Sequence, residues 1–169
     1  LFWLRHKVIL RPKYQLSVGI HPGFNFRYED AVIKGVESNY IVTRRYLTEE
    51  LNQNFVVSKQ VSISLYYMYG RGIDVGTTKH THYLSLRAAF FNLKIAKDIT
   101  VRLNPQVFYL KTDDKDGFFL AASLGIMKKN WPISIGAMMN QKIKSTIVTK
   151  DFNWNVGLNY VFGEKFKKY

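Results

Sequence analysis

The sequence predicts an all-β protein, an antiparallel up-and-down transmembrane β-barrel of eight strands, and three observations lead to this fold class. Apolar and polar residues alternate with a period of two through most of the 169 residues, which is the length of one domain. Phe, Trp and Tyr make up 15% of the chain, and these residues favour strands. No run of 18 apolar residues occurs, so the sequence contains no transmembrane helix.

The last alternating segment, 152–162, shows the pattern best. Every second residue from Phe152 to Phe162 is apolar, and the residues between them are Asn or Gly except for Val161. In a strand this alternation gives one apolar face and one polar face. No helical pattern follows that could cover the apolar face, so we expect that face to meet a partner sheet or lipid.

Seven earlier segments alternate in a similar way and are also predicted to be strands. In the first segment only Ile9 breaks the polar face, and Pro12 marks a position where one ladder donor is missing. In the fourth segment the apolar parity changes after Phe90, which predicts a bulge near Phe91 and Asn92. The predicted strands are 8–20, 37–57, 61–69, 82–96, 99–109, 118–126, 133–144 and 152–162.

The connections between these segments differ in length. Residues 21–36 begin with His-Pro-Gly and stay polar, so they are predicted to be a long loop or an extension above the sheet. Residues 58–60 and 97–98 read as tight turns. An even number of strands, with short turns on one side and longer loops on the other, is typical of a transmembrane barrel. We assign 1–162 to the barrel and 163–169 to a short basic C-terminal tail.

The polar faces are predicted to line the barrel interior. Lipid offers the backbone no hydrogen-bond partner, so a sheet in the bilayer must close, and eight strands leave an interior filled by side chains. The polar faces hold few charges for a surface in water, which argues against a soluble lipocalin-like carrier with its apolar face inside. The interior residues predicted in this way are Glu50, Arg87, Arg102, Asn104, Gln106, Asn153, Asn155 and Asn159.

Charged residues inside such a barrel need partners. We expect Glu50 to pair with Arg102 or Arg87, because an unpaired buried charge is costly. Paired side chains would fill the interior of an eight-stranded barrel and leave no channel, so we expect no measurable ion conduction.

The segment 37–57 has the least regular pattern. Arg45, Glu49 and Gln53 share a face with Phe55, and a charge facing mid-bilayer lipid costs about 2–4 kcal/mol for Arg or Lys. Either this half of the strand rises above the membrane, or a protein partner covers it.

The chain carries 25 basic and 12 acidic residues, a formal net charge of +13. Such a balance favours nucleic acid or an anionic membrane surface as a partner. The basic residues do not form one stripe, so no nucleic-acid partner is predicted. Basic residues on the long-loop side are expected either to contact lipopolysaccharide phosphates or to form a generic solubilising rim. The four residues assigned to this contact are Lys111, Lys142, Lys144 and Lys150.

No catalytic or metal site is predicted, and no cofactor. His80 and His82 are spaced as two metal ligands on one strand face would be, but no third ligand follows, so two solvated histidines are expected. Residues 113–117 lack the alternating acidic spacing of a calcium loop. Ser85 and His82 have opposite parity, so they do not form a nucleophile and base pair, and no enzyme is expected. The chain has no cysteine, so disulfides and thiolate zinc sites are excluded.

With its eight strands and the aromatic-rich segment 152–162, the chain resembles small outer-membrane barrels of Gram-negative bacteria, of the OmpX type. The Tyr-rich run 66–72 is similar in style to outer-membrane proteins of the Bacteroidota. The resemblance implies an outer-membrane location and recognition by the barrel-assembly machinery, with Tyr160 and Phe162 as the assembly signal. The tail 163–169 departs from the many members of this class that end at the terminal Phe. The resemblance carries over no catalytic residues.

Three functions remain open at this stage. The first is a non-catalytic structural or accessory barrel, as a subunit of a larger outer-membrane complex. The second is the C-terminal part of a larger porin or transport barrel, since the chain starts at Leu1, without an initiator Met, and is expected to be a processed chain or part of a longer one. The third and least favoured is a soluble lipocalin-like carrier.

Overall fold

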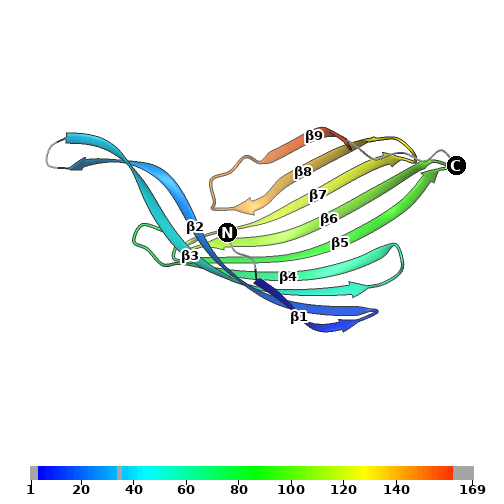
Figure 1. The fold of residues 1–169 in the computed structure, drawn as a ribbon, viewed down its shortest axis with the longest axis horizontal. Helices are drawn as coiled ribbons and strands as arrows, with labels where there is room; N and C mark the ends of the chain where they lie inside the picture. The colour runs from blue at the N-terminus through cyan, green and yellow to red at the C-terminus, as the bar shows by residue number, and fades with distance from the viewer. Residues whose placement is uncertain (1–3, 34–35, 162–169) are drawn as a thin grey trace.

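The computed structural model describes residues 4–33 and 36–161, which form one curved antiparallel sheet of nine strands (Figure 1). Each strand pairs with the next along the chain, so the topology is up-and-down. In this part of the chain no helix is long and apolar enough to cross a membrane. The strands are β1 (Leu4–Arg11), β2 (Tyr14–Ile33), β3 (Val36–Val56), β4 (Val61–Gly72), β5 (His80–Ala96), β6 (Ile99–Thr112), β7 (Lys115–Lys128), β8 (Ile133–Ser145) and β9 (Phe152–Tyr160).

The prediction of eight strands was wrong, because the first predicted strand is a hairpin. The segment 8–20 divides into β1 and β2 at a two-residue turn, with Arg11 opposite Tyr14. Pro12 lies in this turn, where its fixed φ and missing N–H are suited to a reversal of the chain. The apolar alternation continues across the turn, so periodicity alone does not reveal the break.

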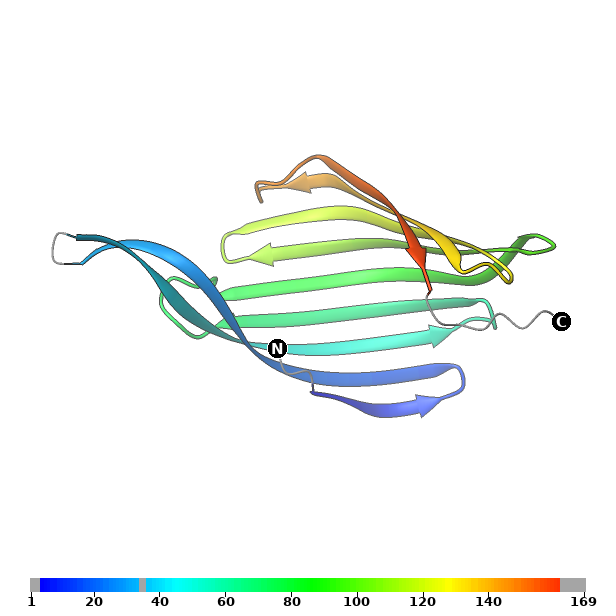
Figure 2. The ribbon, with the colours of Figure 1, turned by 45° about the horizontal axis from the view of Figure 1, so that its top comes forward.

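Of the two alternatives predicted for 21–36, a long loop or an extension above the sheet, the structure shows an extension, because β2 and β3 continue as a long hairpin. The pairing of β1 with β2 ends at Ile20, and that of β4 with β3 ends at Tyr46. Residues 24–33 and 36–45 therefore pair only with each other and form an arm that projects beyond the sheet (Figures 1 and 2). Ten residues of strand correspond to an arm of roughly 33 Å.

The connections lie at two ends of the sheet, as the sequence predicts. Residues 12–13, 57–60, 97–98 and 129–132 form short turns at one end. Residues 73–79 and 146–151 form longer loops at the other end, which is also the side of the arm. One connection at that end departs from the prediction, because only residues 113–114 join β6 to β7. The predicted bulge in β5 is present, because the register with β6 shifts between Phe90 and Leu93 and Asn92 has a φ of 51°.

The two faces of the sheet differ in polarity. The buried polar side chains lie on one face, whereas apolar side chains on the opposite face are exposed, such as Leu86 at 49% and Leu158 at 73%. The polar face is concave, because residues from β3 to β9 line one cavity on it. Ser17, His21, Glu50, Ser62, Ser64 and Ser85 are the buried polar residues in the described part of the chain.

The sheet is open rather than closed into the predicted barrel. β1 pairs only with β2, and β9 pairs only with β8, so within residues 4–33 and 36–161 no ladder joins the two edge strands (Figure 2). The sheet is compatible with a barrel wall in its curvature, topology and division of faces. Its two edges leave backbone groups that have no partner strand in this part of the chain.

Candidate functional site

A trough of about 780 Å³ runs along the concave face. The strand registers place its central residues in one row across the sheet, from β3 to β9. Small and amide side chains dominate this row, and one arginine interrupts it. The row is Asn54, Ser64, Arg87, Gln106, Ala121, Asn140 and Asn153.

The trough contains two arginines and no acidic lining residue. Arg87 lies opposite Ser64 and Gln106, and Arg102 lies further along β6, with its guanidinium carbon 5.8 Å from the centre of the Phe91 ring. Both arginines are exposed to the trough. Arg102 lies opposite Gly125 on β7, and the next residues in this register on β8 and β9 are also glycines. None of these three glycines has a side chain that could fill the space beside Arg102.

Hydrogen bonds hold part of the trough wall in place. The Asn104 amide donates to the Ser123 hydroxyl at 3.0 Å, and the Ser64 hydroxyl donates to the Asn54 amide oxygen at 2.9 Å. The amide of Gln106 donates to the hydroxyl of Tyr83. In contrast, the side chains of Asn140, Asn153 and Asn155 make no hydrogen bond within the described part of the chain, so their amides are available to a solute.

A second polar cluster lies on the concave face near β1 and surrounds Glu50. The side chain of Glu50 is fully buried, and both of its oxygens accept hydrogen bonds from the Arg5 guanidinium, with Arg5 Nη2 at 2.8 Å from Oε2. The Tyr66 hydroxyl donates to Oε2 at 2.8 Å, and His21 Nε2 lies 3.3 Å from it. We name Arg5, His21, Glu50 and Tyr66 the Glu50 cluster. It joins the first four strands.

The Glu50 cluster corrects the expected ion pair. Glu50 faces the concave side, but its arginine partner is Arg5 rather than Arg102 or Arg87. The reason is the unrecognised hairpin, since β1 brings Arg5 beside Gly19, which in turn lies opposite Glu50. A Cβ atom on Gly19 would lie 2.6 Å from Glu50 Oε1, so the bare glycine is what lets the carboxylate approach.

The structure brings together most of the residues that the sequence assigned to the interior. Arg87, Arg102, Asn104, Gln106, Asn153 and Asn155 all line the trough. Glu50 lies apart from them, and Asn159 lies further along β9, opposite Ser134. Sequence reasoning missed Asn54, Ser123 and Asn140 as lining residues, although each has the polar-face parity of its strand.

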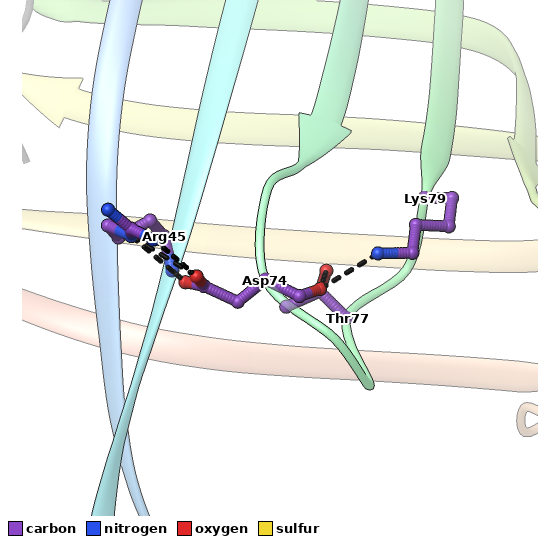
Figure 3. A network of polar contacts seen from close by, with 4 residues as sticks. All are labelled: Arg45, Asp74, Thr77 and Lys79. Carbon is purple, nitrogen blue, oxygen red and sulfur yellow. Dashed lines mark hydrogen bonds and ion pairs between the residues drawn. The ribbon is translucent and has the colours of Figure 1, made fainter.

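The loop 73–79 at the other end of the sheet is tied to β3 by Asp74 (Figure 3). Arg45 Nη2 lies 2.7 Å from Asp74 Oδ1, and the backbone N–H of Arg45 donates to Oδ2. These bonds lower the pKa of Asp74 to about 2. Thr77 Oγ1 and Lys79 Nζ both donate to the Asp74 carbonyl oxygen, at 2.6 and 2.9 Å, so the loop has a defined shape.

The two histidines expected to be solvated make hydrogen bonds with tyrosines. Tyr67 Oη lies 2.9 Å from His82 Nδ1, and Tyr69 Oη lies 2.8 Å from His80 Nδ1. The rings of Tyr69 and His80 are stacked, with centres 6.0 Å apart. No group of three His, Cys, Asp or Glu residues within the described ranges could hold a metal ion.

The residues assigned to lipopolysaccharide lie at the long-loop end. Lys111 and Lys144 are the last residues but one of β6 and β8, and Lys150 lies in the loop 146–151. Lys142 is different, because it forms an ion pair with Asp151. Of the assembly signal, Tyr160 ends β9 and is 54% exposed, whereas Phe162 and the tail 163–169 lie outside the described residues.

Comparison with protein-family models, with curated proteins and with solved structures finds no match to this chain.

Proposed function

We propose that the chain is a non-catalytic wall element of an outer-membrane β-barrel, with its convex face towards lipid and its concave face towards the lumen. The single observation that carries the proposal is the division of the faces. In a lipid bilayer the outward residues of each strand are apolar and the lumenal residues are polar. A soluble carrier would need the reverse, with apolar residues inside and polar residues in water.

The open sheet favours the second function predicted from the sequence, a part of a larger pore-forming barrel. A free strand edge inside the bilayer would leave several backbone groups without partners, at several kcal/mol each. Further strands must therefore pair with β1 and β9 in the membrane. An open trough of about 780 Å³ supports a lumen that contains water rather than one filled by side chains.

Lipid, the assembly machinery and lipopolysaccharide are the partners that this proposal includes. Lys111, Lys144 and Lys150 are the candidates for lipopolysaccharide phosphates, while Lys142 is already paired with an acid. Glu49 and Gln53 remain on the outward side of β3, and Glu49 is exposed, so a protein partner along β3 also remains part of the proposal.

Carbonate extraction of membranes that contain the chain tests the proposal directly. A lipid-facing wall element stays in the membrane pellet at high pH and changes its gel mobility after boiling in detergent. Release into the soluble fraction would contradict the proposal. Intact mass of the mature protein then shows whether the additional strands of a larger barrel lie on the same polypeptide or on a partner.

A further inference from the structure

The trough carries positive charge that no nearby acidic side chain offsets. Arg87, Arg102 and Lys59 line it, and no Asp or Glu does. Within residues 4–33 and 36–161, neither arginine makes an ion pair, and the acidic groups that are paired lie elsewhere, in the Glu50 cluster and the loop end. The two guanidinium groups are therefore free to meet a ligand.

Arg87 has hydrogen-bonding neighbours in its row, whereas Arg102 lies further along the trough. Arg87 lies in the row that contains Gln106, Asn140 and Asn153. Arg102 lies on the same strand as Gln106 and four residues from it, a separation of roughly 13 Å along the strand. The two arginines therefore lie at different points along the trough.

We propose that the trough binds small soluble anions, specifically polar solutes that carry a phosphate or carboxylate group. This inference depends on the proposed function, because a lumenal trough gives such solutes access. A guanidinium group binds carboxylate and phosphate oxygens through two parallel N–H donors. Side-chain amides bind the hydroxyl groups of the same solute, and rings of Arg or Lys make pores selective for anions and phosphates.

The trough is suited to a soluble anion rather than to the headgroup of a lipid. The arginines lie on the concave face, and the apolar side chains that would meet lipid lie on the convex face. A phospholipid in the bilayer would therefore reach the outer lysines and not Arg87 or Arg102.

A fluorescent label in the trough tests the inference. The full chain has no cysteine, so Ala121→Cys gives one labelling site in the arginine-containing row, and Val107→Cys gives a control site on the convex face of β6. Both labelled proteins are studied in detergent at low salt. The measurement is quenching of an uncharged bimane label by iodide and by caesium.

The expected iodide-to-caesium quenching ratio is at least about threefold higher at position 121 than at position 107, because fixed charge in a cleft concentrates counter-ions. Arg87→Gln with Arg102→Gln should remove this difference, whereas the two Arg→Lys changes should keep most of it. Lys111→Gln with Lys144→Gln changes the net charge equally outside the trough and should leave the ratio unchanged.

Occupancy by a solute is measured with the same label. Glucose 6-phosphate should protect position 121 from iodide, and glucose at the same concentration should not. Equal quenching ratios at the two labels, or a ratio unaffected by the arginine changes, would overturn the inference. Protection by phosphatidylglycerol micelles but not by glucose 6-phosphate would also overturn it. These readouts need no membrane, so they fail or succeed independently of carbonate extraction.

Discussion

Replacing Arg5 with Gln tests the energetics of the Glu50 cluster. The Glu50 side chain is fully buried, while the Arg5 side chain is 36% exposed, so the two partners are affected differently by the loss of the other. Without Arg5, the buried carboxylate still accepts a hydrogen bond from Tyr66, and His21 still lies beside it. Removing one partner of a buried ion pair costs about 3–5 kcal/mol, and the remaining partners place this change near the lower value.

Replacing Glu50 with Gln should cost less. Arg5 can then turn its guanidinium towards water, because it is already partly exposed, and the main loss is that of charged hydrogen bonds. After discounting for solvent screening, this loss amounts to about 1–2 kcal/mol. The double change Arg5→Gln with Glu50→Gln should cost less than the sum of the single changes, because the two residues are in contact.

Urea unfolding of the chain in detergent micelles measures the difference. With a slope of about 2 kcal/mol per molar urea, a loss of 3 kcal/mol lowers the unfolding midpoint by about 1.5 M. Arg11→Gln is the matched control, since Arg11 is an exposed arginine on the same strand, and it should move the midpoint little. A larger loss of unfolding free energy for Glu50→Gln than for Arg5→Gln would refute the assignment of Glu50 as the buried partner of this ion pair.

Three further outcomes follow from the same structure. Gly19→Ala places a Cβ atom 2.6 Å from Glu50 Oε1 and should destabilise the protein by about 1–3 kcal/mol in urea, whereas Gly157→Ala, with no atom within 4 Å, should be nearly neutral. The pKa of Asp74 is lowered from 3.8 to about 2, so its contribution to loop stability is complete above about pH 4 and is lost as the pH falls through 2. Amide exchange of residues 73–79 should accelerate over that pH range, and an unchanged exchange rate would contradict this prediction. Leu86→Arg on the convex face should cost about 2–4 kcal/mol in lipid if it lies near the bilayer midplane, and no loss there would place this face in water.

The period-two pattern predicted the sheet well because each strand has faces of different polarity. Strand bounds from β4 to β9 lie close to those expected, and the bulge at Asn92 follows from the parity change after Phe90. The pattern failed at Pro12, where apolar residues alternate through a turn without interruption. Over 21–36 the pattern left a long loop and an extension above the sheet both open, although Phe24, Phe26 and Tyr28 alternate as strand residues.

The candidate site was predictable only where it depends on parity. Arg87, Arg102 and the amides of β6 and β9 face the trough because their strands alternate. Pairing across strands cannot be obtained in this way, since it depends on register and on which strands are neighbours. Arg5 could be matched to Glu50 only once β1 was known to pair with β2. Closure of the sheet is likewise a property of its edges, which alternation does not describe.

Because of the arm, one part of β2 and of β3 is more stable than the other part of the same strand. Residues 14–20 of β2 and 46–56 of β3 have a neighbouring strand on each side, whereas residues 24–33 and 36–45 pair only with each other. An isolated two-stranded ribbon is marginally stable in water. The pairing between β2 and β3 in the arm should therefore open reversibly from the end at Ile33 and Val36. This opening should stop where the Tyr46 ring packs over Gly23. Each of these two strands is therefore held in place where it lies within the sheet and opens readily where it lies in the arm.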